Sequence, residues 1–315
     1  LGYDHVFYVK IASGSVFSYL VNKGDANAIR RTVNNILLDG PSLRAYRHFP
    51  NVGKRKSWAA ADASKRGIEL SIISSYQDEI YESVQNEDKW GFETNFLDNS
   101  ELGFGKDLNN WVIQNVLFKV LFPAEFHGQS AVEAAIELSD EFNQNINKLE
   151  KVNIYTHEPA VRIISNKDIL KNASDRDHSL EYMVAAALLY GDLKYEMYEE
   201  SFQGFEKINN LRKKIFVTEE PQFTKDYYDF SKRHISNSIE IVYNDNSISE
   251  KITIENPIGH PSRRDEAVPL MKEKFLRNVK SIFDTEKASE VWNKIINLKK
   301  DDNLNVFFNI LIENE

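Results

Sequence analysis

The spacing of apolar residues predicts that the first hundred residues are mainly helical. In segment 24–40, GDANAIRRTVNNILLDG, apolar side chains recur three or four positions apart, at Ala28, Ile29, Val33, Ile36 and Leu37. Asp25 stands where a helix N-cap is expected, and Gly40 and Pro41 follow as stop signals. Segment 57–77, SWAAADASKRGIELSIISSYQ, indicates a further helix whose alanines allow close packing.

The pattern changes near residue 115. Segment 115–126, NVLFKVLFPAEF, is a branched and aromatic run ended by Pro123, and it predicts a strand. Segment 130–151 follows, and its apolar residues at helical spacing predict one amphipathic helix. The alternating residues of 152–157, VNIYTH, predict a second strand.

Two more strands and a return to helix complete the pattern. Segment 239–256 predicts two strands around the turn residues Asn244 to Ser247. From Pro269 onward the sequence predicts helix again, with a final helical segment at 288–298, ASEVWNKIINL. The predicted order is therefore helical, then mixed α and β, then helical.

Composition limits the classes of function. The 315 residues suffice for two domains, and 42% hydrophobic with 28% charged residues is typical of a soluble globular protein. A net charge of −9 argues against non-specific nucleic-acid binding, although a local positive cluster could still bind a small acidic ligand. No stretch is apolar for long enough to span a bilayer. The absence of cysteine excludes disulfides, thiolate catalysis and cysteine-ligated iron–sulfur clusters within this sequence.

The sequence starts at Leu1, inside a continuous pattern and without signal-peptide character. We therefore expect it to be the later part of a longer polypeptide.

Four stretches concentrate positive or proton-transferring side chains. The first is segment 43–63, LRAYRHFPNVGKRKSWAAADA, whose basic residues are Arg44, Arg47, His48, Lys54, Arg55 and Lys56. One interpretation is a solvated basic loop. The other centres on Lys56, because a lysine partly desolvated at the start of a closely packed helix has a lowered pKa and can transfer protons.

The second stretch contains Lys119 and His127. Lys119 interrupts an apolar run, where its ammonium must reach solvent or find an anion. His127 precedes a helix start, and a lone histidine there is more often structural than catalytic.

The third stretch is 173–191, ASDRDHSLEYMVAAALLYG, in which charge precedes a segment that is apolar on every side. Such a segment predicts a buried helix, and its N-terminal end is a candidate anion site that Arg176 and His178 would reinforce. Tyr182 could donate a proton or a hydrogen bond there. The alternatives are simple capping, or a metal site for which the spacing matches no strong motif.

The fourth stretch, 258–269, IGHPSRRDEAVP, contains His260, Arg263 and Arg264 in a loop with Gly and Pro. Paired arginines are suited to bidentate carboxylate binding, but they could equally bridge surface acids. Nucleotide, zinc-protease and serine-hydrolase motifs are absent, and we interpret His157 and His234 as structural.

Several segments together carry a family resemblance. RTVNNILLDGPSLRAYRH, RKSWAAADASKR, NVLFKVLFPAEFHGQSAVEAA, ASDRDHSLEYMVAAALLYG and PIGHPSRRDEAVPLMKEKF, in this order and spacing, resemble the dehydratase branch of the MmgE/PrpD family. The resemblance implies a mainly α fold with an α+β lid. It places a helical core domain in 1–114, the lid in 115–262, and helices that return to the core domain in 263–315.

The resemblance also implies a reaction. Members of this branch dehydrate 2-methylcitrate to 2-methyl-cis-aconitate in the methylcitrate cycle of propionate catabolism, without metal or cofactor. We expect a small tricarboxylate substrate, a homodimer, no nucleic-acid or membrane partner, and a cytoplasmic location or, alternatively, the mitochondrial matrix. The alternatives are a cis-aconitate decarboxylase or a broader citrate dehydratase of the same family, and an inactive truncated remnant that acts as an interaction module.

By position, the resemblance implies one set of site residues, the catalytic residues His5, Lys56, Lys119, His127 and Tyr182. As a hypothesis, we add the substrate-binding residues that would hold carboxylates: Arg44, Arg47, His48, Arg176, His178 and Arg263. A histidine or lysine would act as base and Tyr182 or a protonated lysine would assist departure of the hydroxyl, with base and acid not assigned individually.

Overall fold

The computed structural model describes residues 2–47, 50–102, 115–299, 301–303, 305, 308 and 309. The chain divides into two compact units, Leu1–Asn109 and Asn110–Glu315, each with its own core. The finer division inferred from the resemblance, in which residues 263–315 return to the first domain, stays a prediction.

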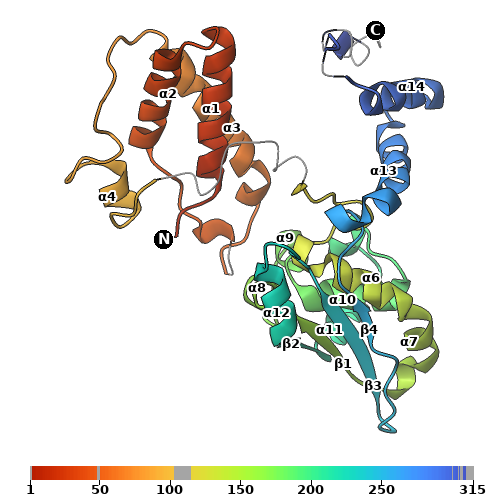
Figure 1. The fold of residues 1–315 in the computed structure, drawn as a ribbon. Helices are drawn as coiled ribbons and strands as arrows, with labels where there is room; N and C mark the ends of the chain where they lie inside the picture. Colours follow the sequence, from red (N-terminus) through yellow and green to blue (C-terminus); the bar gives the residue numbers. More distant parts are fainter. Residues whose placement is uncertain are drawn as a thin grey trace. The chain divides into compact units, whose positions relative to one another are not determined.

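The N-terminal unit is helical, as predicted (Figure 1). Its described helices are α1 (Val6–Val21), α2 (Ala26–Asp39), the 3₁₀ turn η1 (Ala45–Arg47), α3 (Arg55–Ser74) and α4 (Phe92–Phe96). Asp25 caps α2 by accepting from the backbone N–H of Asn27, and Gly40 ends the helix with φ of 67°. The apolar core of the unit is formed by Phe7, Ile36, Leu37, Leu70 and Phe92.

A close helix crossing holds this unit together. Helices α1 and α3 meet at Gly14 and Gly67, where an added Cβ on Gly67 would lie 2.3 Å from the Lys10 carbonyl oxygen. Only glycine permits this approach of the two backbones. Lys10 is buried beside the crossing and binds Asp39 at 2.7 Å and the Gly40 carbonyl at 2.6 Å.

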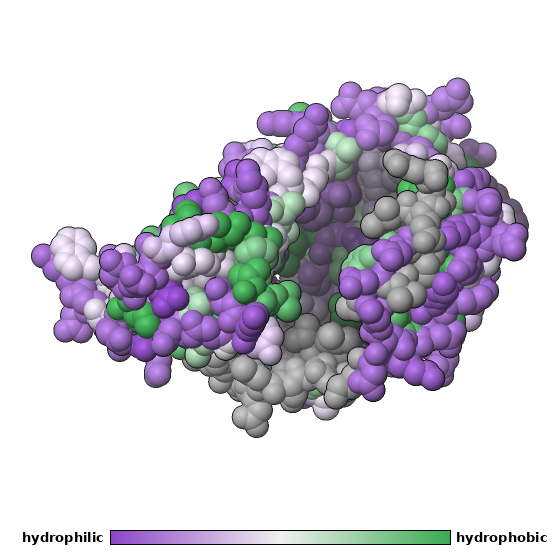
Figure 2. All heavy atoms as spheres, turned by 90° about the horizontal axis from the view of Figure 1, so that it is seen from above, coloured by the Kyte–Doolittle hydropathy of each residue, from purple (hydrophilic) through white to green (hydrophobic). Residues whose placement is uncertain are grey.

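Hydrophobic patches interrupt the hydrophilic surface of the N-terminal unit, which is at the left of Figure 2. Large apolar side chains of this unit that are exposed include Val16, Leu20 and Ile72. Among the described residues, no helix is long and apolar enough to cross a membrane.

The C-terminal unit is built on a four-stranded mixed sheet in the order β2-β1-β3-β4. The strands are β1 (Leu149–Thr156), β2 (Ile215–Glu219), β3 (Asn237–Tyr243) and β4 (Ile252–Ile254). β1 pairs with β2 in parallel, and β3 pairs antiparallel with both β1 and β4. The prediction of a strand at 152–157 and of two strands around Asn244–Ser247 is confirmed. β2 was not predicted.

Helices cover one face of this sheet (Figure 1). The described helical elements of this unit that precede β3 are η2 (Phe126–Gly128), α6 (Gln129–Glu137), α7 (Ser139–Asn145), η3 (Ile146–Lys148), α8 (Glu158–Ile164), α9 (Ala173–Arg176), α10 (Leu180–Tyr190), η4 (Tyr195–Tyr198), α11 (Phe205–Arg212) and α12 (Pro221–Tyr228). α10 is buried from Leu180 to Leu188 and packs between α6 and α11, so the prediction of a buried helix is confirmed. The opposite face is polar, where Glu240 accepts from Asn153 and Tyr155.

Two sequence-based predictions in this unit were wrong. Residues 116–125 form no strand, because among the described residues only one backbone bond, from the Phe118 N–H to the Gly259 carbonyl at 2.9 Å, links this segment to a distant one. The helix predicted over 130–151 is interrupted at Leu138 and ends before β1, which takes Leu149 into the sheet.

The predicted return to helix after the sheet is confirmed. η5 (Pro261–Arg263) leads into α13 (Arg264–Val279), and α14 (Thr285–Ile296) follows. α13 and α14 pack through a small apolar cluster around Phe283, Ala288 and Val291.

Candidate active site

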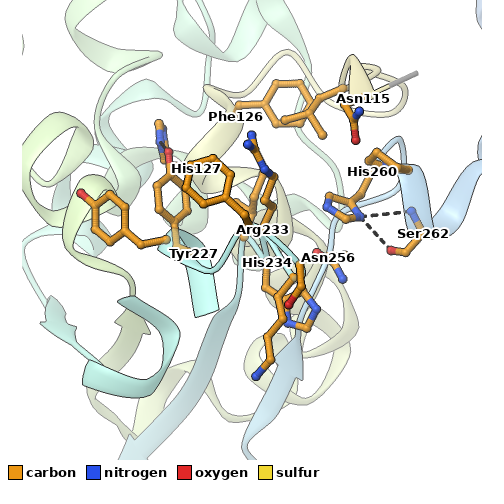
Figure 3. A pocket seen from close by; sticks show the side chains of 16 residues that line it. Asn115, Phe126, His127, Tyr227, Arg233, His234, Asn256, His260 and Ser262 are labelled. Atoms are coloured by element: carbon orange, nitrogen blue, oxygen red, sulfur yellow. Dashed lines mark hydrogen bonds between the residues drawn. The ribbon is translucent and has the colours of Figure 1, made fainter. Parts of the chain in front are cut away.

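A pocket of about 670 Å³ lies within the C-terminal unit (Figure 3). Five of its lining residues carry basic or imidazole side chains: His127, Lys232, Arg233, His234 and His260. Its remaining described lining residues are apolar, aromatic or neutral polar, and none is Asp or Glu. Lys232 is neutralised by Asp226 at 2.7 Å, so the cation in this lining without a described carboxylate partner is Arg233, which can attract an anionic ligand.

The elements around the pocket come from distant parts of the sequence. η2 contributes His127, α12 contributes Tyr227, the turn before β3 contributes Arg233, and the start of η5 contributes His260. His127 is tied to the sheet by Asn237 at the start of β3, whose side-chain amide donates to the His127 carbonyl at 2.9 Å. The sheet therefore helps to fix the position of His127.

A carboxylate–imidazole pair stands at the pocket. His127 Nδ1 lies 2.9 and 3.0 Å from the two carboxylate oxygens of Glu125, and the His127 backbone N–H also donates to Glu125 at 2.8 Å. Because an ionised carboxylate only accepts, Nδ1 carries a proton and Nε2 is left with a lone pair in the neutral ring. Nε2 lies 3.2 Å from the hydroxyl of Tyr227.

Electrostatics keep Glu125 ionised. Burial by itself would raise the pKa of its carboxyl, but the hydrogen bonds and positive charge of His127, with a smaller contribution from His178, lower that pKa to about 2. The carboxylate therefore orients His127 at any physiological pH.

A buried histidine, His157, stacks against Tyr227. The His157 ring stacks on Tyr227 with centroids 4.7 Å apart and planes at 10°, and its centroid is 5.3 Å from that of His127. His157 is fully buried, and burial, followed by the charge of His127, lowers its pKa to about 4. Burial also raises the pKa of Tyr227, so its hydroxyl stays protonated and can donate.

Of the three catalytic residues predicted in this unit, one lines the pocket and two do not. His127 lines the pocket, whereas Lys119 is exposed in an irregular segment, so the expectation that it interrupts a strand was wrong. Tyr182 is completely buried, and its hydroxyl donates to the Met197 carbonyl at 2.6 Å. Burial raises the pKa of Tyr182 to about 12. Neither Lys119 nor Tyr182 is among the described residues that line the pocket.

The predicted carboxylate binders of this unit are largely occupied. Arg176 is 2% exposed and donates through Nε to the Tyr198 carbonyl, so it supports the core. His178 binds Asp177 through Nδ1. Arg263 binds Glu133 at 2.8 Å and Glu266 at 2.8 and 3.0 Å, which fits the alternative of arginines that bridge acids.

The N-terminal unit contains a second basic cluster. Arg44 lies 3.2 Å from His5 Nδ1, and both line a smaller pocket of about 250 Å³. Arg47 binds the buried Asp4 at 2.8 Å. Burial, followed by the charge of Arg47, lowers the pKa of His5. The structure thus brings His5, Arg44 and Arg47 together.

Two further residues of this unit were predicted for the site. Lys56 is half-buried in the first turn of α3, as its position at a helix start led us to expect. His48 lies outside the described residues.

Sequence reasoning missed Glu125, Tyr227 and Arg233, and interpreted His157 and His234 as structural. One signal was available, since AEFHG places a carboxylate two residues before His127. Tyr227 and Arg233 are separated from His127 by about a hundred residues and carried no such signal. Within the described ranges, no group of three or more His, Cys, Asp or Glu side chains could hold a metal ion.

Comparison with known proteins adds the family. 2-Methylcitrate dehydratase of Escherichia coli K12 is 40% identical over 294 residues, which cover 92% of this chain and 61% of that protein. The mitochondrial 2-methylcitrate dehydratase of Yarrowia lipolytica is 36% identical over 314 residues, 98% of this chain and 60% of that protein. The chain thus spans about three fifths of the length of these relatives.

Domain comparison covers both units of the chain. Residues 1–105 match the MmgE/PrpD N-terminal domain, and residues 122–300 match the MmgE/PrpD C-terminal domain. The resemblance inferred from the sequence segments is confirmed: the chain belongs to the MmgE/PrpD family.

Proposed function

We propose that the chain dehydrates 2-methylcitrate to 2-methyl-cis-aconitate, as a carbon–oxygen lyase. The observation that carries the proposal is the pocket itself, in which His127, held by Glu125, shares the lining with Lys232, Arg233, His234 and His260, and in whose described lining there is no Asp or Glu. The names of the relatives, 2-methylcitrate dehydratase, support the same reaction.

The chemistry requires a base, an acid and a positive environment. A base removes a proton from the carbon next to a carboxylate, the electron pair of that C–H bond forms the double bond, and the neighbouring C–O bond breaks. An acid protonates the departing hydroxyl so that water leaves. Cations hold the carboxylates and offset the negative charge that develops during elimination.

We assign the base role to His127. With Nδ1–H held by Glu125, the Nε2 lone pair can take the proton from carbon, and the Glu125 carboxylate stabilises the imidazolium that results. Tyr227 donates to Nε2 in the resting state and can turn its hydroxyl toward a ligand. The roles implied by the resemblance for His5, Lys56, Lys119 and Tyr182 stay predictions, and the position of Tyr182 in the core gives its role no support.

The test is an absorbance assay with purified protein, 2-methylcitrate and EDTA, which follows the conjugated double bond of the product. The proposal expects absorbance to rise without release of CO2. Release of CO2 from cis-aconitate would instead assign the decarboxylase reaction, and faster turnover of citrate than of 2-methylcitrate would assign the broader dehydratase. No turnover of any of the three would favour the non-catalytic alternative.

We also propose a homodimer without nucleic-acid partners, in the cytoplasm or the mitochondrial matrix. The acidic net charge supports the absence of nucleic-acid binding, and the resemblance supports the dimer. Light scattering at two protein concentrations would measure the assembly, and a mass of one chain at both would refute the dimer.

A further inference from the structure

Arg233 has an unusual backbone conformation at the edge of the pocket. Its φ is 51°, in the left-handed region that residues other than Gly, Asn and Asp rarely adopt. The turn before it enforces this conformation, because the Asp229 carbonyl accepts from the N–H groups of Lys232 at 3.0 Å and Arg233 at 2.8 Å. The Asp229 carboxylate also accepts from the Ser231 N–H and hydroxyl at 2.8 and 2.6 Å. A strained residue at a pocket is a reason to look for function.

No described carboxylate neutralises the charge of Arg233. Its guanidinium lies over the Phe230 ring at 4.7 Å and has no carboxylate partner among the described residues. The neighbouring Lys232, by contrast, binds Asp226 at 2.7 Å. The side chain of Arg233 lines the same pocket as His127 and His260 (Figure 3).

The surroundings of Arg233 hold its backbone in place. The nearby His260 ring interacts electrostatically with the Arg233 backbone, and its Nδ1 contacts the hydroxyl of Ser262 at 2.8 Å. The hydrogen bonds to the Asp229 carbonyl hold the Arg233 backbone itself. A guanidinium on a fixed backbone, facing a pocket with no acidic lining residue among those described, is suited to bidentate carboxylate binding.

We propose that Arg233 binds one carboxylate of a tricarboxylate substrate in this pocket and thereby positions the substrate against His127. The inference rests on the proposed function, which it extends by naming the residue that recognises the anion. We assign carboxylate binding to Arg233 rather than to Arg176 and Arg263, because those two arginines already bind groups of the protein.

The unusual backbone of Arg233 provides a clean experiment. Glycine adopts positive φ without strain, so Arg233→Gly removes the guanidinium while preserving the turn. The matched control is Lys23→Gly, which also removes a cation from an exposed position with positive φ, 53°, but in the N-terminal unit. The probe is propane-1,2,3-tricarboxylate, which has no hydroxyl and cannot be dehydrated, and its binding is measured by calorimetry.

We expect Arg233→Gly to weaken binding of this probe by about 10- to 100-fold, the range for loss of hydrogen bonds to a charged group. Lys23→Gly should bind within about twofold of wild type, and Arg233→Lys should restore binding in part. The melting temperature of Arg233→Gly should equal or exceed that of wild type, so that a loss of binding cannot come from a disturbed turn.

Equal binding by wild type and Arg233→Gly, or no binding by wild type, would overturn the inference. The outcomes also separate it from the proposed function. Arg233-dependent binding without turnover of 2-methylcitrate would sustain the carboxylate site and refute the dehydratase. Turnover with the same KM in wild type and Arg233→Gly would sustain the dehydratase and refute the role of Arg233.

Discussion

Replacement of His157 by Phe tests the electrostatics of the site through stability. His157 is fully buried, its Nε2 has no hydrogen-bond partner among the described residues, and its Nδ1 contacts are long, at 3.4 Å. Phe retains the aromatic stack on Tyr227 and removes a titratable group. The change in pH dependence is therefore separable from the change in packing.

The magnitude follows from the pKa of His157, which burial and the charge of His127 lower from 6.5 to about 4. Below pH 6.5 the unfolded chain binds a proton that the folded chain refuses, so the free energy of unfolding falls as pH drops toward 4. Each pKa unit is about 1.4 kcal/mol, so wild type loses about 2 kcal/mol from this residue between pH 7.5 and pH 5. His157→Phe does not undergo this loss.

The assay is urea unfolding of wild type and His157→Phe, followed by circular dichroism at pH 7.5, 6 and 5. The stability of the variant relative to wild type should rise by about 2 kcal/mol across this range, whatever its value at pH 7.5. If the stability difference between His157→Phe and wild type stayed constant with pH, His157 would have the same pKa in the folded and the unfolded chain, and the predicted burial effect would be refuted.

Two further variants test packing in the two units. Gly67→Ala should lower the free energy of unfolding, measured with urea, by about 1–3 kcal/mol, because its Cβ would lie 2.3 Å from the Lys10 carbonyl oxygen. The control is Gly53→Ala, whose Cβ meets nothing nearer than 4.0 Å and should leave the stability nearly unchanged. Arg176→Met should cost about 1–3 kcal/mol in the same assay, because it leaves the buried Tyr198 carbonyl without its donor; unchanged stability with lost substrate binding would return Arg176 to the role of carboxylate binder.

Periodicity predicted those parts of the fold that depend on local chemistry. The spacing of 24–40, its Asp25 cap and the Gly40 stop predicted α2 to within two residues at its start, because each signal acts on the adjacent backbone. The all-apolar segment after Ser179 predicted the buried helix α10 for the same reason.

Predictions that depended on partners distant in sequence were weaker. Segment 115–126 has the composition of a strand, but a strand needs a neighbouring strand, and in the described part of the chain only Phe118 bonds to the backbone of a distant segment. Arg176 stands in a sequence segment typical of an anion site, but in the fold its guanidinium donates to the Tyr198 carbonyl instead. Glu125 was missed because burial and His127 together give it a function that no single residue type reveals.

His127, oriented by Glu125, is proposed to transfer the proton in dehydration. This role is tested by kcat for 2-methylcitrate with wild type and His127→Gln, alongside calorimetric binding of propane-1,2,3-tricarboxylate to both. We expect a loss of about 10²- to 10⁴-fold in kcat, with binding retained within a few-fold. An unchanged kcat in His127→Gln would refute this role and assign the base to another residue.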